Sequence, residues 1–526
     1  MTAVTFSFIA FGVLLVLSSS TLSGECARIL AFFPTTMRSH QLMNCALAKV
    51  LAEAGHNVTV LGATTNVYPR AKYRYLRIDG PAIGNELTKN FIKIPSMYTS
   101  IYMGMLHPIL RVHNATLAQP KVQHFLQTSQ ESDYDLLLLT YLINDFHIGL
   151  GAHFKCPIIL FYVMEPTQKI HSWVGNPAEL SYAPLQLSGM VQPLSFFERV
   201  KNFLWYLLEF VLMYGFMETS IEEFYKYNFP PDRYPPLDEV RKNVSLVFTN
   251  HHFSQGPIRP NVPNLIEIGG IQVKEKPDPL PTDIAKILDE SKEGVIYFSL
   301  GSNIQGSHLT EEKIKIMFNV ISKLPYKVLW KWAPNELPGE SKNIIFREWL
   351  PQDDILAHPN IKLFITHGGM GSVVESQYHG VPMVGIPLFG DQPSNMANVV
   401  NSGYGLSVDY ITMTEESLNS AIQDVLHNPK YKETVQKFSR LYRDRPMTPR
   451  QTVVYWVDYV LRHQGAKHMQ SPAVHLNRWQ LLSVDVIGFL LAIVLISAFV
   501  IIKVFKLICC CGKKNKLPKV KKAKQN

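Results

Sequence analysis

The stretch from Phe364 to Gln392, FITHGGMGSVVESQYHGVPMVGIPLFGDQ, constrains the fold more than any other part of the chain. It combines a short apolar strand pattern, a glycine-rich turn at His367, a helical segment and a second apolar strand pattern. Glycines in the turn allow the backbone to approach a ligand closely. A helix that starts at about Gly371 presents free N–H groups to that turn, which favours an anion such as a phosphate. We therefore expect an open α/β sheet with a ligand beyond the carboxyl ends of its strands.

The same alternation of strands and helices continues on both sides of a proline-rich segment. Alternation of this kind predicts parallel β-α-β units, so each side is expected to form a Rossmann-like α/β domain. The chain of 526 residues is also too long for one hydrophobic core. We place the first domain at residues 26–271, the linker at 272–283 and the second domain at 284–463.

Two apolar runs lie near the ends of the sequence. The first falls within residues 1–25 and precedes small residues, a pattern typical of a secretory signal peptide. The second, Val486–Ile502, holds 17 uncharged residues, which is at the low end for a membrane-spanning helix. We predict a juxtamembrane linker at 464–483, a single transmembrane helix at 484–505 and a basic tail at 506–526. The lysines after the run place the tail in the cytosol, so a type I topology with lumenal domains is expected.

The net charge of +9 is confined to the tail. Residues 503–526 hold nine lysines and no acidic residue, so the rest is formally neutral (9 − 9 = 0) and nucleic acid is not an expected partner. Lys524 and Lys522 stand third and fifth from the end, which is similar to the dilysine retrieval signal of endoplasmic-reticulum membrane proteins, although a solvated lysine run is the alternative. Asn114 and Asn243 are candidate glycan acceptors. The six cysteines form no evident disulfide framework or metal site.

Several motifs together carry a family resemblance. T-H-G-G is followed by Glu375 eight residues after the histidine, by G-V-P-M-V-x-x-P and by D-Q, while W-L-P-Q at 349–352 and F-S-L-G-S at 298–302 stand upstream. This pattern resembles the membrane-bound animal UDP-glycosyltransferases, of the UDP-glucuronosyltransferase and UDP-glucosyltransferase type, including arthropod members. The resemblance implies the GT-B fold, in which two Rossmann-like domains face each other, plus one C-terminal transmembrane helix. The alternative is a glycine-rich turn between ordinary Rossmann-like elements.

The resemblance also implies that the second domain binds a UDP-sugar as a co-substrate. Trp349 offers a flat face for the uracil, and Gln352 can pair with its polar edge. Glu375 is placed to accept hydrogen bonds from the sugar hydroxyls of the nucleotide. Asp391 and Gln392 would bind the hydroxyls of the transferred sugar.

Two glycine-rich turns are expected to stabilise the charge that builds up on the diphosphate. The groups proposed for this role are Ser302, His367, Gly369, Gly371 and Ser372. Many relatives have asparagine where this chain has Gly371, so one contact is expected from the backbone instead. Neither a metal nor another cofactor is expected, because these groups can stabilise the charge themselves.

His40 matches the position of the family's catalytic base, at the end of the first strand-turn segment. Relatives place an acid six residues after the aromatic residue that corresponds to Tyr134, and this chain has Thr140 there. Asp145, five residues further on, is the predicted substitute that orients the imidazole and stabilises its cation.

The predicted function is transfer of a sugar from a UDP-sugar to a hydroxyl of a small lipophilic acceptor, with inversion and a β-glycosidic product. The arthropod resemblance favours UDP-glucose as the donor, with UDP-glucuronate second. A dinucleotide-dependent oxidoreductase lacks its G-x-G-x-x-G pattern here, and Gly301–Ser307 lacks the lysine of an NTPase P-loop. A membrane receptor that binds a UDP-sugar or a lipophile without catalysis stays an alternative because of Thr140.

The segment Phe196–Phe229 has 12 aromatic residues in 34 positions. Three interpretations are open, namely an acceptor pocket for flat lipophilic molecules, a surface that dips into the membrane, or an ordinary aromatic core beneath long loops.

Overall fold

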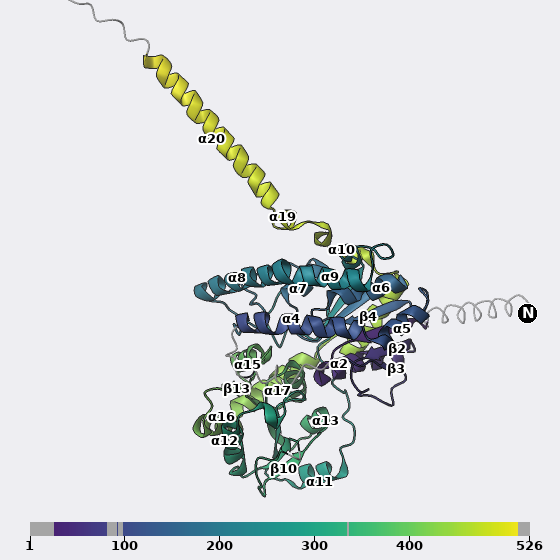
Figure 1. Ribbon diagram of the computed structural model, residues 1–526. Helices are drawn as coiled ribbons and strands as arrows, with labels where there is room; N and C mark the ends of the chain where they lie inside the picture. The colour runs from purple at the N-terminus through teal and green to yellow at the C-terminus, as the bar shows by residue number, and fades with distance from the viewer. Residues whose placement is uncertain (1–25, 81–91, 93–97, 334–335, 514–526) are drawn as a thin grey trace, which may run out of the picture. The chain divides into compact units, whose positions relative to one another are not determined.

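The first part of the chain builds a seven-stranded sheet with the order β3-β2-β1-β4-β5-β6-β7, parallel throughout. The computed structural model describes residues 26–80, 92, 98–333 and 336–513 (Figure 1). The central strands are buried on both faces, which explains their unbroken apolar sequences. The strands are β1 Arg28–Phe33, β2 Asn57–Gly62, β3 Arg74–Arg77, β4 Leu136–Thr140, β5 Ile158–Tyr162, β6 Val244–Thr249 and β7 Leu265–Glu267.

Helices cover both faces of this sheet. One face packs on α2 and α18, and the other packs on the layer that runs from α4 to α10. The helices of the first part are α2 Arg38–Glu53, α4 Tyr98–Leu117, α5 Pro120–Thr128, η1 Asp145–Ile148, α6 Gly149–Phe154, α7 Gln168–Val174, α8 Phe196–Phe210, the π-helical η2 Val211–Met217, α9 Glu218–Asn228 and α10 Leu237–Arg241.

The second sheet has six parallel strands in the order β10-β9-β8-β11-β12-β13. Its two faces carry separate apolar cores. The strands are β8 Val295–Ser299, β9 Lys327–Lys331, β10 Ile344–Arg347, β11 Ile361–Thr366, β12 Met383–Gly385 and β13 Gly405–Ser407. The helices are α11 Thr282–Glu290, η3 Gly306–His308, α12 Glu311–Ser322, α13 Gln352–Leu356, α14 Met370–His379, α15 Gln392–Asn401, α16 Glu415–His427, α17 Pro429–Arg443, α18 Pro449–Arg462 and η5 Lys467–Met469.

Strand order decides where each sheet can bind a ligand. In the first sheet β1 lies between β2 and β4, so the segments that follow β1 and β4 open into one crevice. These segments carry His40, near the start of α2, and Thr140, at the end of β4. In the second sheet β8 lies between β9 and β11, and the turns after β8 and β11 carry Ser302 and His367. Both sheets therefore present predicted site residues at their carboxyl edges.

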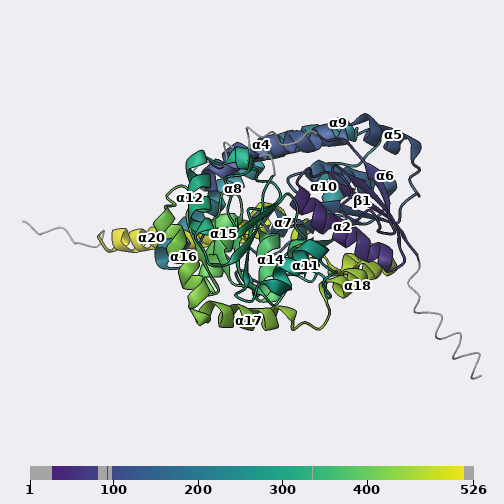
Figure 2. The same ribbon diagram turned by 90° about the horizontal axis from the view of Figure 1, so that it is seen from below.

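Residues up to Ser471 form one compact unit, and residues from Pro472 form another. Within the first unit, α18 lies in the predicted second domain but packs against α2 through Val453 and Val457 (Figure 2). The predicted limits of the two Rossmann-like domains and of the linker stay predictions. The linker contacts helix α13 beside the second sheet, because the backbone N–H of Lys274 donates to the Asp353 carboxylate.

The second unit contains η6 Pro472–His475, α19 Arg478–Leu481 and α20 Val484–Lys513. Within the part of the chain that the structure describes, one helical segment, Val484–Cys509, is long and apolar enough to cross a membrane. It contains the predicted span 484–505. The predicted signal peptide at 1–25 and the lysines at 522 and 524 lie outside the described residues.

Candidate active site

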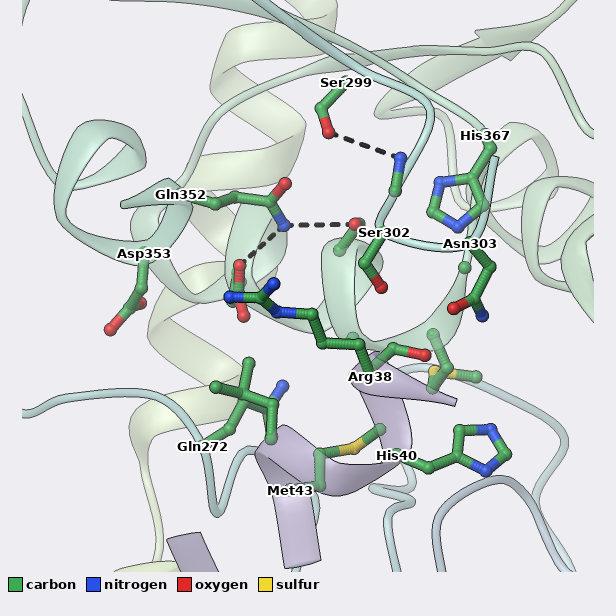
Figure 3. Close-up of a pocket in the computed structure, with 18 of the residues that line it drawn as sticks. Arg38, His40, Met43, Gln272, Ser299, Ser302, Asn303, Gln352, Asp353 and His367 are labelled. Atoms are coloured by element: carbon green, nitrogen blue, oxygen red, sulfur yellow. Dashed lines mark hydrogen bonds between the residues drawn. The ribbon is translucent and has the colours of Figure 1, made fainter. Parts of the chain in front are cut away.

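One cavity of about 380 Å³ collects the predicted site residues, with lining groups from the carboxyl edges of both sheets (Figure 3). His40 lines it from the first sheet's side. The predicted donor residues line it from the second sheet's side, namely Ser302, Trp349, Gln352, His367, Gly369, Gly371, Ser372, Glu375, Asp391 and Gln392. Asp145 is not among the lining residues of this cavity. The segment after β1 of the first sheet and the turns after β8 and β11 of the second sheet thus converge on one site, whereas the segment after β4 does not line it.

Gln352 and Glu375 are held together at the base of the cavity. The Nε2 atom of Gln352, the first residue of α13, donates to Oε2 of Glu375 at 2.7 Å and to Oγ of Ser372 at 3.1 Å (Figure 3). The Tyr297 hydroxyl donates to the Gln352 side-chain oxygen at 3.2 Å. Burial, with a further contribution from Asp353, raises the pKa of Glu375 to about 8. The raised pKa therefore favours the protonated carboxyl at neutral pH before a ligand arrives.

His367 is wedged between two glycines. A Cβ atom at Gly301 would lie 2.7 Å from its ring, and a Cβ atom at Gly369 would lie 2.6 Å from its Nε2 atom. Gly301 also has a φ of +84°, a conformation that disfavours other residues. Burial, assisted by nearby Lys331, lowers the pKa of His367 to about 4. The site thus holds a neutral imidazole, which can donate one N–H group to a phosphate oxygen.

Four residues that line the cavity have buried polar atoms without a hydrogen-bond partner among the described residues. They are the predicted site residues Ser302 (Oγ), His40 and His367 (Nδ1 of each), and Gln272, both of whose side-chain polar atoms are unpaired. The Nε2 atom of Gln272 lies 3.9 Å from the position of a Cβ atom at Gly371. Gln272 therefore reaches toward the space that an asparagine side chain at 371 would fill. No pattern in the sequence pointed to Gln272.

The acid-amide pair after β12 is also ordered. Oδ2 of Asp391 accepts a hydrogen bond from Nδ2 of Asn395 at 2.7 Å, and burial raises the pKa of Asp391. The side-chain oxygen of Gln392 accepts from the backbone N–H groups of Leu388 and Phe389 at 2.8 and 3.1 Å. These bonds leave the amide nitrogen of Gln392 as the group that it can offer to a sugar hydroxyl.

The guanidinium of Arg38 covers the Trp349 ring, a contact that the sequence did not predict. The guanidinium carbon of Arg38, on the first turn of α2, lies 4.0 Å from the centroid of the Trp349 ring. The Nζ atom of Lys331 lies 5.4 Å from the same centroid and donates to the carbonyl of Gly301 at 2.7 Å. Burial, together with Arg38, lowers the pKa of Lys331 to about 8. Arg38 thus occupies an indole face that a uracil base could use.

The imidazole of His40 has two different sides. Its Nδ1 atom is buried and has no hydrogen-bond partner in the described part of the chain, which leaves Nε2 as the ring nitrogen that can serve the cavity lined by His40. Burial lowers the pKa of His40 to about 4. A neutral imidazole with an accessible Nε2 atom can accept a proton from a hydroxyl in the cavity.

Asp145 does not support His40, which corrects the sequence prediction. Its Oδ1 atom accepts from the Tyr141 hydroxyl at 2.9 Å, and its Oδ2 atom pairs with Lys169 at 3.1 Å and Arg241 at 3.0 Å. These two cations lower the pKa of the Asp145 carboxyl despite its burial. Asp145 sits in an ion-pair network because its Oδ2 atom compensates the charges of Lys169 and Arg241, while its Oδ1 atom satisfies the Tyr141 hydroxyl.

The neighbour with which His40 interacts electrostatically is a second imidazole instead. His113, on α4, is close enough to His40 to interact with it electrostatically and also contacts the backbone of Leu142. The Nδ1 atom of His113 and the Oγ1 atom of Thr140 are buried without hydrogen-bond partners among the residues described. Where the family pattern has a carboxylate, this chain has Thr140, whose hydroxyl is buried and unpaired among the residues described.

Solved structures with the same architecture define the class of fold. The glycotransferase of kitacinnamycin aligns with a TM-score of 0.55 and 17% identity over 84% of this chain and 100% of that one. The spinosyn forosaminyltransferase SpnP aligns with a TM-score of 0.57 and 14% identity over 83% of this chain and 100% of that one. Together with the two parallel Rossmann-type sheets, this likeness confirms the predicted GT-B fold.

Sequence comparison then gives the family. Residues 29–519 match the family model described as UDP-glucoronosyl and UDP-glucosyl transferase. UDP-glycosyltransferase UGT5 of Dactylopius coccus is 36% identical over 485 residues, which cover 90% of both chains. Human UDP-glucuronosyltransferase 2B10 is 31% identical over 511 residues, which cover 93% of both chains. The chain belongs to the UDP-glycosyltransferase family and is a transferase, as the sequence motifs predicted.

Proposed function

We propose that the enzyme transfers glucose from UDP-glucose to a hydroxyl of a small lipophilic acceptor, with inversion at the anomeric carbon. The observation that carries this proposal is the meeting of the accessible Nε2 atom of His40 with the family's donor motifs in one cavity. UDP-glucosyltransferase 2 of Dactylopius coccus, 35% identical over 483 residues, supports glucose as the donor sugar. UDP-glucuronate is the donor that the test must exclude.

The donor would lie along the carboxyl edge of the second sheet. In our proposal uracil stacks on Trp349 after Arg38 moves away, and Glu375 binds the ribose hydroxyls. His367 and Ser302 would receive the diphosphate, since one supplies a neutral N–H donor and the other an unpaired hydroxyl. Asp391 and the Gln392 amide nitrogen would hold the transferred sugar. No metal ion or further cofactor is assigned in this mechanism.

The acceptor would enter from the first sheet's side. The Nε2 atom of His40 takes the proton of the acceptor hydroxyl while the oxygen attacks the anomeric carbon opposite the departing UDP. The new C–O bond forms as the bond to the diphosphate breaks, so an α-linked donor gives a β-linked product. Positive charge left on His40 and negative charge on UDP are created together across the cavity.

We further propose that the chain is anchored in the endoplasmic-reticulum membrane with both Rossmann-like domains in the lumen. The apolar segment Val484–Cys509 and the lysines that follow it support this topology. Asn243 is exposed and is the glycan acceptor of this proposal. The side-chain oxygen of Asn114, inside α4, is bonded to Asn228 at 3.1 Å and is less suited to carry a glycan.

The decisive experiment measures UDP release with UDP-glucose and UDP-glucuronate against phenols, steroids and flavonoids. His40→Ala should lose roughly 10²–10⁴ in turnover. UDP affinity by calorimetry should be unchanged in His40→Ala, because the donor contacts lie on the second sheet. An α-linked product by NMR, or a His40→Ala enzyme with full activity on an alcohol, contradicts the mechanism. Preferred turnover of UDP-glucuronate contradicts the donor assignment alone.

A further inference from the structure

Helix α8 exposes a continuous apolar stripe on the first unit. Six apolar side chains of α8, and that of Val211 directly after it, are between 42% and 80% exposed. They are Phe196, Phe197, Val200, Phe203, Leu204, Leu207 and Val211. At 3.6 residues per turn these positions fall within an arc of about 120° on one side of the helix. We call this set the α8 stripe.

The opposite side of α8 faces the protein, where Trp205, Tyr206 and Leu208 pack on the core beside two buried polar residues. Asn202 is fully buried, its Oδ1 atom accepts from the Leu185 N–H at 2.9 Å, and its Nδ2 atom donates to the carbonyls of Leu180 and Ala183. Glu209, two turns later on the same side, is 4% exposed. A surface helix of a soluble domain normally turns its apolar side inward. Helix α8 instead has apolar side chains on both sides, with the exposed stripe pointing outward.

An exposed apolar stripe of this size favours an apolar environment on the outer side of the helix. Single exposed apolar side chains are common on protein surfaces, but contiguous patches mark interaction sites. The capping box between Ser195 and Glu198 fixes the start of the helix, so the stripe is a defined surface and not a frayed end. Of the three interpretations left open for this segment, an ordinary buried aromatic core does not describe these seven side chains.

The position of α8 within the first unit points to the occupant. Helices α8, η2 and α9 are continuous in sequence, and α9 is tied to α10 by the ion pair between Glu218 and Arg241 at 2.5 Å. Figure 1 shows α8, α9 and α10 along one side of this unit. The chain leaves the unit at Gln470, whose Nε2 atom donates to the carbonyls of Lys242 and Val244, just after α10. The exit of the chain and the α8 stripe therefore belong to the same helical layer.

The connection beyond that exit is short. Twelve residues, 472–483, separate Ser471 from the apolar helix α20. Even fully extended, they span at most about 40 Å. If α20 crosses a bilayer, as proposed above, the layer that carries α8 cannot move far from the surface of that bilayer.

We propose that the α8 stripe inserts into the lipid surface of the same bilayer in which α20 is anchored. The charges on α8 cancel, since Glu198 and Glu209 balance Arg199 and Lys201. Insertion therefore relies on the phenylalanine and leucine side chains and does not require anionic lipids. This inference rests on the proposed membrane anchorage of the chain. A second copy of the chain is the competing occupant.

The test uses the full chain with a specific protease site placed in residues 472–483, reconstituted in phosphatidylcholine nanodiscs. Co-elution of the uncut chain with the discs checks the anchorage by itself. After cleavage, the fraction of the 26–471 body that stays with the discs is measured at low and high salt. The double variant Phe203→Ser, Leu204→Ser is compared with wild type. The matched control is Ile411→Ser, Leu441→Ser, which removes two side chains of similar exposure, 48% and 45%, from the second part.

We expect the cleaved wild-type body and the control body to stay on the discs at both salt concentrations. The Phe203→Ser, Leu204→Ser body should be released, with binding about tenfold weaker for each side chain removed. UDP-sugar turnover of the uncut variants should match wild type, which shows that they are folded. Release of the wild-type body after cleavage, or its release by salt alone, overturns the proposal. A released dimer that depends on Phe203 and Leu204 assigns the stripe to a second copy. If the uncut chain itself fails to join the discs, the anchorage is wrong and the inference falls with it.

Discussion

Replacing Thr140 by aspartate should move the pH dependence of catalysis. This substitution puts a carboxylate at the position where the family pattern has an acid and where the wild-type chain has a buried, unpaired hydroxyl. The Nδ1 atom of His40 is likewise buried and unpaired in the described structure. A carboxylate that reaches Nδ1 accepts the Nδ1–H bond and stabilises the protonated imidazole.

The magnitude follows from the environment of the ring. Burial lowers the pKa of His40 from 6.5 to about 4 in the wild-type chain. A carboxylate within hydrogen-bond reach raises the pKa of such a group by about 1–3 units, so Thr140→Asp should bring it to about 5–7. The base acts only when neutral, and kcat/KM therefore falls as pH drops through this pKa. The acidic limb should lie near pH 4 for wild type and about 1–3 pH units higher for Thr140→Asp.

The assay is kcat/KM for a phenol acceptor between pH 4 and pH 8, with UDP binding measured at each pH to confirm that the donor site is intact. Thr140→Asn is the matched control, because it has nearly the same shape as aspartate but no charge. An acidic limb of Thr140→Asp that coincides with wild type would falsify the reasoning. An equal shift in Thr140→Asn would show that shape, not charge, is responsible.

Three further predictions concern the donor side. Glu375 has a pKa of about 8 before binding, so a ligand that requires its ionised form should release a proton near pH 7. That ligand should also bind more tightly as pH rises toward 8. Calorimetry in two buffers measures the proton release, and Glu375→Gln should abolish it. Gln272→Ala should reduce turnover about tenfold or more if its unpaired amide contacts the diphosphate, with Gln272→Glu worse through repulsion; unchanged kinetics of both would exclude that contact. Arg38→Ala should tighten UDP binding about two- to fivefold, because it frees the indole face of Trp349. Trp349→Ala should weaken UDP binding by roughly 1–3 kcal/mol. Weaker UDP binding in Arg38→Ala would mean that the guanidinium contacts the nucleotide.

The donor half of the site could be predicted from the sequence because its chemistry is local. The stretch Phe364–Gln392 encodes a strand, a turn, a helix and a second strand in one continuous segment, and the fold places them as β11, α14 and β12. Gly369, one of the two glycines against His367, lies in the same stretch, whereas Gly301 comes from the turn after β8. Local backbone rules and a dense motif were sufficient there.

The contacts that cross between distant segments could not be predicted in this way. Gln272 and Gly371 are 99 positions apart, and nothing in either local pattern relates them. Arg38 reaches Trp349 only because the two sheets face one cavity. Asp145 was a reasonable choice by sequence spacing, but two buried cations from α7 and α10 attract its carboxylate. Side-chain partners at long range depend on packing that a one-dimensional pattern does not contain.

Thr140, which stands where the family pattern has an acid, does not by itself make the chain a receptor without catalysis. Loss of a carboxylate removes a stabilising partner of the imidazolium, but it leaves the imidazole in place and accessible at Nε2. Because burial keeps the pKa of His40 at about 4, the ring is neutral and ready to accept a proton throughout the physiological pH range. A base with this pKa is weak, and it therefore favours acceptors whose hydroxyl gives up its proton easily, such as phenols, over aliphatic alcohols. The substitution at Thr140 thus fits a transferase for acidic hydroxyls better than a site without catalysis.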